Sequence, residues 1–268
     1  AMSEHIMTAP EMVKVESKHD NSSISQRFYQ VSDNSERIHA VQLVLMESQP
    51  ESAVVFCNTK VEAQELADSL ISKGFSCLAL HGDLEQRDRD QTLVRFANKS
   101  VSVLVATDVA SRGLDIDSVD MVLNYHIAHD PEIHVHRIGR TGRAGSKGVA
   151  CSLISNKEAH KVMKLESYLG HDIEALELPP LDVLNKAPTT ADMVTIQIDG
   201  GKKQKVRAGD ILGALTSGKK IEGKQIGKIQ LFDLRSYVAV HHTIAKLAAK
   251  TIDEGKMKGR NFRARILN

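Results

Sequence analysis

A short stretch rich in arginine and glycine carries the strongest chemical signal in the sequence. Residues His136 to Gly145 include three arginines and three glycines. Arg140 and Arg143 are three positions apart, so on one helical turn they share a face. Two permanently charged, planar donors side by side suit a phosphate that gathers negative charge during phosphoryl transfer. The alternative is a basic turn that pairs with surface carboxylates.

The elements that must position these arginines alternate between strands and helices. The apolar patterns predict strands at 26–31, 53–57, 77–80, 101–106, 121–125 and 149–154, and helices at 36–47, 61–73, 85–96 and 157–169. This alternation predicts an α/β domain with a mainly parallel, two-sided sheet. Ligands of such sheets bind beyond the carboxyl ends of the strands. The candidate loops therefore begin at Asn58, His81, Thr107 and His126.

A change of charge near residue 189 indicates a second domain. From Thr189 onward the chain carries 16 Lys and Arg against 7 Asp and Glu, a net charge of +9, whereas the preceding residues carry −8. Prolines at 179, 180 and 188 mark a linker at the same place. We predict a tail at 1–20, a first domain at 21–178, a linker at 179–189 and a second domain at 190–268. The excess of positive charge favours a polyanionic partner, although a solvated lysine-rich surface is the alternative.

The second domain shows the order βαββαβ. Strands are predicted at 193–198, 226–231, 236–240 and 261–267, and helices at 208–215 and 243–252. This order is that of a small α+β, ferredoxin-like domain, and the positive charge favours an RNA-recognition motif. Small regulatory and metal-handling domains share the same order, so the order alone is a weak signal.

The overall composition restricts the class of protein. No apolar run reaches the roughly eighteen residues that a membrane span needs, and no signal-peptide pattern opens the chain. Cys57, Cys77 and Cys151 are far apart and form no CxxC pair, which argues against a disulfide framework or a zinc site. We therefore expect no membrane partner and a cytoplasmic protein.

Five motifs, taken together, resemble the second RecA-like domain of DEAD-box ATP-dependent RNA helicases. They occur in the family's order over roughly residues 25–170. The motifs are Val54 to Thr59, His81-Gly82-Asp83, Gln86 to Arg89, Val105 to Asp115, and His136 to Arg143.

The resemblance implies roles for residues at matching positions. Arg140 and Arg143 would act as arginine fingers on the γ-phosphate of ATP, and His136 and Arg137 would link to the partner domain across the cleft. Gly113 and Asp115 would lie beside the nucleotide. The positions at which the family touches the RNA backbone are Thr59, Gly82, Arg89, Thr107 and Arg112. Such groups hold phosphates without reading bases. The simpler alternatives are a turn cap for Asp115, a strand end for Thr107 and a surface ion pair for Arg89.

Two motifs of the family are absent from these 268 residues. The sequence contains no G-x-x-x-x-G-K-[ST] loop and no Asp-Glu-Ala-Asp. The resemblance assigns the phosphate cradle, the Mg²⁺ ligand and the catalytic carboxylate to a first RecA-like domain. We therefore expect a C-terminal portion that does not hydrolyse ATP on its own.

Within the family, the basic second domain is similar to the RNA-binding domain of the bacterial DbpA type. This similarity implies delivery to a hairpin of 23S ribosomal RNA (rRNA) and to assembly intermediates of the large ribosomal subunit. The two strand segments that normally present stacking aromatics contain only one aromatic residue, Tyr237, so binding is expected to depend more on charge and shape. The candidate contacts are Lys202, Lys203, Lys205, Arg207, Lys219, Lys220, Arg235, Tyr237, Lys256, Lys258, Arg260 and Arg263.

The leading interpretation is therefore part of an RNA helicase with RNA-stimulated ATPase activity. One alternative is a non-catalytic RNA-binding protein whose RecA-like domain is only a scaffold. Another keeps the helicase but makes the small domain a protein-binding module.

Overall fold

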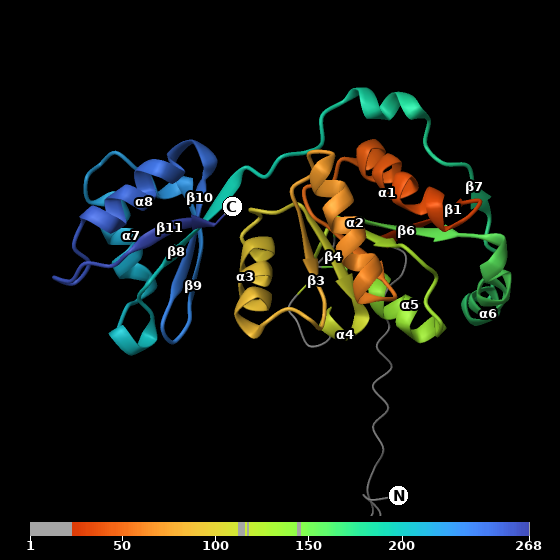
Figure 1. The fold of residues 1–268 in the computed structure, drawn as a ribbon, viewed down its shortest axis with the longest axis horizontal. Coiled ribbons are helices and arrows are strands. Elements are labelled where there is room, and N and C mark those ends of the chain that lie inside the picture. Colours follow the sequence, from red (N-terminus) through yellow and green to blue (C-terminus); the bar gives the residue numbers. More distant parts are fainter. Residues whose placement is uncertain (1–22, 112–115, 117, 144–145, 268) are drawn as a thin grey trace, which may run out of the picture.

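The computed structural model describes residues 23–111, 116, 118–143 and 146–267. Its larger domain contains a sheet of seven strands, and every pair of neighbours is parallel. Across the sheet the order is β3-β4-β2-β5-β6-β1-β7 (Figure 1). The strands are β1 (Ile24–Gln30), β2 (Ala53–Cys57), β3 (Cys77–Leu80), β4 (Val103–Thr107), β5 (Met121–Asn124), β6 (Gly148–Ile154) and β7 (Ala175–Leu176). The predicted α/β class and parallel sheet are confirmed.

Helices connect these strands and cover the sheet. They are α1 (Asn34–Ser48), α2 (Lys60–Ser72), α3 (Gln86–Ala97), α4 (Asp108–Ser111), α5 (Pro131–Ile138) and α6 (Ala159–Leu169). The sequence patterns did not predict α4, α5 or β7, which have only 4, 8 and 2 residues. Elements this short show too few apolar repeats for a period to emerge.

Polar caps fix where three of these helices begin. The Asp33 side chain accepts from the amides of Ser35 and Glu36 at the start of α1. Thr59 and Glu62 form a capping box at the start of α2. At α5, the Asp130 side chain accepts from the Glu132 amide, and proline occupies the first turn, where its missing N–H costs nothing.

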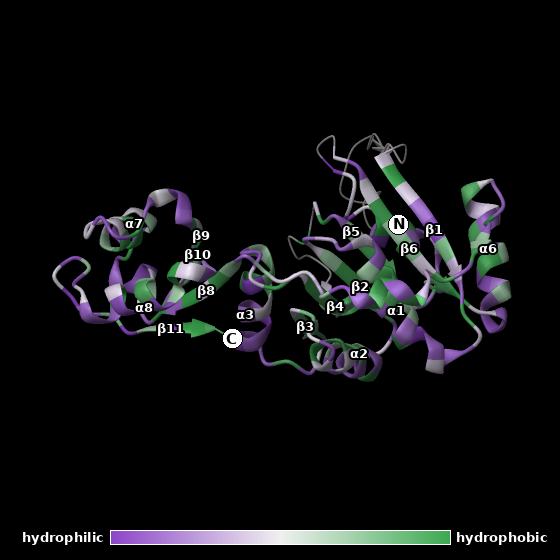
Figure 2. Ribbon diagram, turned by 90° about the horizontal axis from the view of Figure 1, so that it is seen from above, coloured by the Kyte–Doolittle hydropathy of each residue, from purple (hydrophilic) through white to green (hydrophobic). Residues whose placement is uncertain are grey.

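The core of the large domain occupies both faces of the sheet. Every residue of β2 is buried, and its side chains alternate between two hydrophobic clusters. Val55 lies in the cluster that contains Leu66 of α2, whereas Phe56 lies with Phe96 of α3 on the other face. Figure 2 shows the corresponding apolar colouring of the central strands.

The small domain has the predicted order βαββαβ. Its antiparallel sheet is arranged β11-β8-β10-β9 and is covered on one face by two helices. The elements are β8 (Met193–Ile198), α7 (Ala208–Thr216), β9 (Ile226–Leu231), β10 (Ser236–His241), α8 (Ala245–Glu254) and β11 (Ala264–Leu267). Ile196, Ile198, Val238 and Val240 point toward the helices and form the core with Ile211.

Short 3-10 helices complete the described chain. They lie at Asn156–Glu158, Leu181–Asn185, Lys202–Gln204, Gly223–Gln225 and His242–Ile244. The second of these falls inside the predicted linker, and its Val183 and Leu184 pack against the core cluster beside α1. The connection between the domains is therefore attached to the large domain over part of its length.

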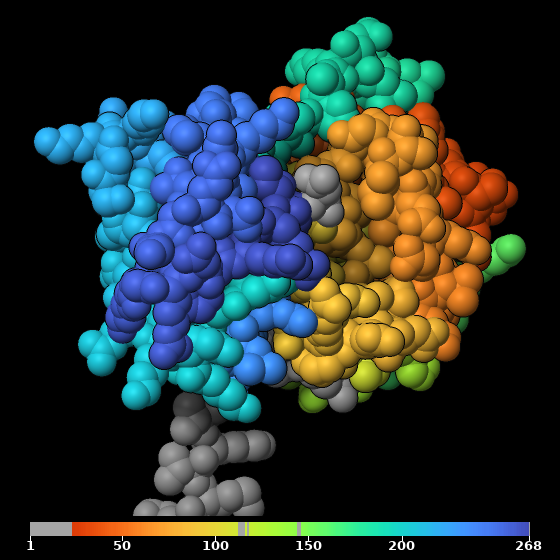
Figure 3. All heavy atoms as spheres, turned by 60° about the vertical axis from the view of Figure 1, so that its left-hand side comes forward, coloured from red at the N-terminus to blue at the C-terminus, as the bar shows by residue number. Residues whose placement is uncertain are grey.

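The outer face of the small sheet lies against α3 of the large domain (Figures 1 and 3). The Asn98 side-chain amide donates to the Thr195 hydroxyl at 3.1 Å, and the two hydroxyl oxygens of Ser100 and Thr195 are 2.6 Å apart. Farther along β8, the side-chain amide of Gln91 donates to the side-chain oxygen of Gln197 at 3.0 Å. The amino end of α3 therefore lies beside the carboxyl end of β8. Among the described residues, no helix is long and apolar enough to cross a membrane.

Candidate functional site

A small cavity opens where β4 passes into α4, at the carboxyl edge of the parallel sheet. Its volume is about 50 Å³, and its walls come from β2, α4, α5 and the turn after α5. The lining residues are Phe56, Asp108, Ser111, Ile133, His136, Arg137 and Arg140. The structure thus brings three of the four predicted catalytic residues, His136, Arg137 and Arg140, to one cavity, whereas Arg143 is not among the described residues that line it. Cationic and hydroxyl groups at such an edge suit a phosphate.

Arg137 also reaches this cavity, but its guanidinium is engaged within the domain. It donates to Asp108 through Nε at 2.7 Å and through Nη2 at 2.6 Å, and it lies 5.3 Å from the centre of the Phe56 ring. It also donates to the side chains of Asn124 and Asn58 and to the His126 carbonyl. Only 2% of the residue is exposed. Its side chain positions α5 against β4 and β5, and the link from Arg137 to a partner domain stays a prediction.

The turn that carries Arg140 and Arg143 is held from both sides. The Thr141 hydroxyl donates to the Val119 carbonyl at 2.5 Å and to the Asp120 carbonyl at 3.1 Å. Arg143 Nε donates to the Gly139 carbonyl at 2.6 Å. A Cβ added to Gly148 would lie 2.3 Å from Thr141 Oγ1, so glycine is needed where β6 starts beside this turn. Arg140 and Arg143 are each half-buried, at a turn with little freedom to shift.

The residues predicted to touch the RNA backbone lie at the same edge of the sheet. Thr59 and Gly82 are exposed in the loops after β2 and β3. Thr107 ends β4 and is 7% exposed. Arg89 is half-buried on α3, and its Nη2 donates to the Ala110 carbonyl at 3.2 Å. The remaining predicted residues, Arg112, Gly113 and Asp115, lie outside the described residues.

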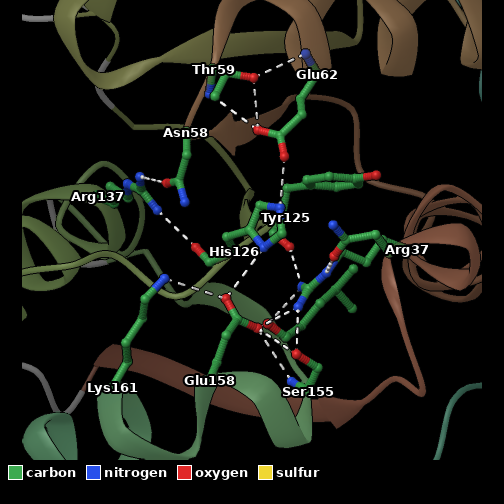
Figure 4. A network of polar contacts seen from close by, with 12 residues as sticks. Arg37, Asn58, Thr59, Glu62, Tyr125, His126, Arg137, Ser155, Glu158 and Lys161 are labelled. Atoms are coloured by element: carbon green, nitrogen blue, oxygen red, sulfur yellow. Dashed lines mark hydrogen bonds and ion pairs between the residues drawn. The ribbon is translucent and has the colours of Figure 1, made fainter.

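A chain of polar contacts supports Thr59 from behind (Figure 4). Glu62 accepts from the Thr59 amide at 3.1 Å and from its hydroxyl at 3.0 Å. The other carboxylate oxygen of Glu62 is 2.9 Å from His126 Nε2, and His126 Nδ1 is 3.2 Å from Glu158. Carboxylates therefore face both ring nitrogens of His126.

The same chain ends on a buried arginine of α1. Arg37 has no exposed surface and donates to Glu158, to the Ser155 hydroxyl and to the carbonyls of Tyr125 and Leu153. Burial raises the pKa of Glu158, but its contacts with His126 and Arg37 outweigh burial and lower that pKa to about 2. The carboxylate therefore stays ionised at neutral pH and joins α1 to the segment after β6.

Most of the predicted contacts of the small domain gather at one end of its sheet. Backbone bonds join Lys202 to Phe232 and Asp199 to Arg263, and Lys258 Nζ donates to the Lys205 carbonyl at 2.9 Å. These links bring together the β8–α7, β9–β10 and α8–β11 connections. We call this group the basic end; it comprises Lys202, Lys203, Lys205, Arg207, Arg235, Lys256, Lys258, Arg260 and Arg263. All are exposed except Arg235, which is half-buried.

Three predicted contacts do not belong to the basic end. Lys219 and Lys220 are exposed after α7, toward the opposite end of the sheet. Tyr237 is only 3% exposed, and its ring packs edge-on against Phe232 with centroids 5.4 Å apart. Tyr237 is therefore largely covered, although it lines a groove between α3 and the β9–β10 turn, and its contact with RNA stays a prediction.

Comparison with known families separates the chain into two matched segments. Residues 36–145 match the model of the helicase conserved C-terminal domain, and residues 195–266 match that of the DbpA RNA binding domain. The chain is 47% identical over 267 residues to the ATP-dependent RNA helicase DbpA of Escherichia coli K12. That match covers 100% of this chain and 58% of the relative. This chain belongs to the DEAD-box family and is of the DbpA type.

Other relatives agree with this assignment. The DbpA of Bacillus subtilis is 31% identical over 288 residues, covering 100% of this chain and 60% of that protein. The chain thus spans about three fifths of the length of these two DbpA proteins. Among solved structures, E. coli SrmB bound to the regulator of ribonuclease activity RraA has a TM-score of 0.55 at 33% identity. The match covers 63% of this chain and 96% of that one.

A second structural relative contains ligands. Saccharomyces cerevisiae Dbp5 L327V, bound to RNA and ADP BeF3, has a TM-score of 0.53 at 31% identity, with 62% of this chain and 46% of that one covered.

Sequence reasoning missed several residues of this DEAD-box domain. Asp108 holds Arg137, and Ser111 lines the cavity, although both fall inside a motif that we had quoted. An acidic residue directly after a buried strand is a signal that could have indicated Asp108. In the small domain, sequence reasoning also missed Phe232, which is 36% exposed beside the basic end; no motif or spacing in the sequence pointed to it.

Proposed function

We propose that this chain supplies the arginine side of the ATP site and the RNA-targeting domain of an ATP-dependent RNA helicase. Its RNA is a hairpin of 23S rRNA, and its role is to remodel RNA while the large ribosomal subunit is assembled in the cytoplasm. Support for the rRNA target comes from the match to the DbpA RNA binding domain and from the basic end of the small domain.

The observation that carries the enzymatic part is the cavity shared by Arg140, His136, Asp108 and Ser111. The residues fit a phosphate: Arg140 and His136 offer donors, and Asp108 is already paired with Arg137 and so adds little repulsion. ATP, when bound, would supply the γ-phosphoryl group that is transferred to water, with ADP as the leaving group, and this hydrolysis would release the RNA. Arg140 and Arg143 would stabilise the charge that develops during this transfer.

We propose that a first RecA-like domain provides the rest of the site, including the phosphate cradle and the Mg²⁺ ligands. Closure of two such domains over RNA would bend one strand and separate a short duplex. In this mechanism Thr59, Gly82 and Arg89 hold the RNA backbone without reading bases. A non-catalytic RNA-binding protein, by contrast, would need no phosphate-binding cavity at Arg140.

Binding of the 268-residue chain to labelled fragments that tile 23S rRNA tests the targeting. A hairpin fragment should bind more tightly than a random duplex, and its affinity should fall steeply with salt because phosphate contacts release counterions. Equal binding of hairpin and random duplex would overturn the rRNA assignment. Affinity that does not change with salt would indicate that the basic end is not an RNA surface.

A further inference from the structure

We propose that a groove between the two domains binds an unpaired nucleotide of the RNA. The groove has a volume of about 560 Å³ and is formed by α3 of the large domain and by the β9–β10 turn of the small domain. We call it the interdomain groove; its principal lining residues are Arg87, Asp90, Lys202, Phe232, Leu234 and Arg235. The inference rests on the proposed function, because it takes RNA as the ligand of this chain.

The first argument is the position of the interdomain groove. Gln91 pairs with Gln197 near the carboxyl end of β8, whereas Asn98 pairs with Thr195 near its start. The basic end of the small domain therefore lies beside the amino end of α3 (Figure 1). Arg89, a predicted contact for the RNA backbone, lies on the same end of α3, two residues from Arg87. The interdomain groove thus connects the two surfaces proposed to hold RNA.

The second argument is the chemistry of its walls. Phe232 is 36% exposed and Leu234 is 57% exposed, although both lie among charged residues. Arg87, Lys202 and Arg235 supply positive charge and outnumber the two carboxylates of the lining, Asp90 and Asp233, of which Asp233 is also 3.9 Å from Lys203. An aromatic side chain beside cations is the combination that holds a base by stacking and its phosphates by charge. The volume falls within the range of about 300–1,000 Å³ that small ligands occupy.

A second cavity continues from this groove and adds a polar group. It has a volume of about 210 Å³ and shares Asp90 and Phe232 with the interdomain groove. Gln230 lines it, and the buried Oε1 of Gln230 accepts no hydrogen bond from any described residue. A buried acceptor without a donor is unfavourable. The N–H group of a base stacked on Phe232 is the kind of donor that would satisfy it.

The turn that presents Phe232 is rigid. The Phe232 amide donates to the Arg235 carbonyl at 2.8 Å, and the Lys202 amide donates to the Phe232 carbonyl at 2.8 Å. A Cβ on Gly201 would lie 2.2 Å from that same carbonyl oxygen, so only glycine permits this close approach. Because this backbone is already held and the ring packs edge-on against Tyr237, ordering the site on binding a base costs little.

The test compares two RNA probes on the 268-residue chain. One is a blunt RNA hairpin, and the other is the same hairpin with an unpaired extension of about ten nucleotides. The substitution Phe232→Ala should weaken binding of the extended hairpin by roughly 5- to 150-fold, the usual value of one stacked base, and leave the blunt hairpin unchanged. Leu247→Ala on α8 is the matched control, since Leu247 is 37% exposed, close to the 36% of Phe232.

A second pair of variants tests the contribution of the large domain. Arg87→Gln should weaken binding of the extended hairpin and reduce its salt slope by about one, as expected when one phosphate contact is lost. Lys246→Gln, an exposed position on α8, is the control. Leu234→Ala gives an independent test at an exposed position if Phe232→Ala lowers the melting temperature.

The outcomes separate this inference from the proposed function. If the chain binds neither probe, the proposed RNA function fails. If Lys203→Gln and Arg260→Gln together weaken binding while Phe232→Ala, Leu234→Ala and Arg87→Gln do not, RNA binding stands and the interdomain groove is not a nucleotide site. Loss of binding to both probes in Phe232→Ala would also overturn the inference, because stacking on an unpaired base should spare the blunt hairpin.

Discussion

Three arginines within seven residues have different tasks, and their surroundings distinguish them. Arg137 is 2% exposed and paired with Asp108, whereas Arg140 and Arg143 are half-buried at the turn after α5. A guanidinium that already donates to two carboxylate oxygens has little capacity left for a phosphate. Arg137 therefore positions α5, while Arg140 lines the cavity and Arg143 lies at the same turn; both stay the proposed contacts for ATP.

We predict that Arg143→Ala removes most of the ATPase activity in a longer form that carries the first RecA-like domain. Arginine fingers are worth about 10³ to 10⁵ in rate, because they stabilise charge that appears only in the transition state. Steady-state ATP hydrolysis with saturating RNA provides the measurement. Lys147→Ala, an exposed position nearby, should keep its activity. A loss smaller than about tenfold for Arg143→Ala would contradict the finger role.

At the scale of elements, one buried ion pair joins α1 to the segment after β6. Arg37 donates to Glu158, whose other oxygen contacts His126, and His126 in turn contacts Glu62 at the start of α2 (Figure 4). Helices that are distant in sequence thus share one charged network behind the predicted RNA edge. Burial makes each member of the network depend on its partners.

We predict that Arg37→Met destabilises the large domain by about 3–5 kcal/mol, because it removes the arginine partner of the buried Glu158 carboxylate. Chemical denaturation at neutral pH measures this change. Lys60→Met is the control; the Lys60 side chain is 56% exposed beside Asp83, and such pairs contribute at most about 1 kcal/mol. A cost for Arg37→Met as small as that of the control would show that the network carries no stability.

The pH dependence of the same variant gives a further check. The pKa of Glu158 is about 2 in the folded chain and has an ordinary value of 4.5. A lowered pKa means that the stabilisation is complete above pH 4.5 and is lost as the pH falls from there toward 2. The difference in unfolding free energy between the wild type and Arg37→Met should therefore shrink between pH 5 and pH 3. A difference that stays constant over this interval would exclude ionised Glu158 as its source.

At the scale of the whole molecule, the two domains meet through a polar contact. Thr195 is fully buried, although it lies on the face of the small sheet that is turned away from its own core. Its hydroxyl accepts a hydrogen bond from the side-chain amide of Asn98 and lies beside the Ser100 hydroxyl. Both residues directly follow α3. The docking of the domains therefore depends on hydrogen bonds that the small domain does not need for its own fold.

We predict that Thr195→Val weakens this docking without unfolding either domain. The substitution keeps the volume but leaves the Asn98 donor without an acceptor, at a cost of about 1–3 kcal/mol. Two measurements report the change. The rate of limited proteolysis between residues 179 and 189 and the radius of gyration in solution should both increase. Thr251→Val, on α8, should leave both unchanged. An unaltered cleavage rate in Thr195→Val would mean that other contacts hold the domains together.

The sequence by itself determined the order of the elements and the class of each sheet. Strands such as 53–57, 77–80 and 226–231 were predicted with the bounds that the structure shows. A strand buried on both faces of a sheet is a continuous apolar run, and a strand buried on one face alternates between apolar and polar residues. The arginine stretch and the basic segment were visible for a similar reason: charge and spacing are local properties of the chain.

Only the tertiary structure decided which arginine is buried and which aromatic ring is exposed. Arg137 and Arg140 differ by three positions on one turn, and their difference arises from Asp108 and Asn124, which other strands bring to α5. Tyr237, the aromatic residue among the predicted RNA contacts, is only 3% exposed and packs against Phe232, which is 36% exposed. Burial depends on the packing of segments distant in the chain, which no local pattern encodes.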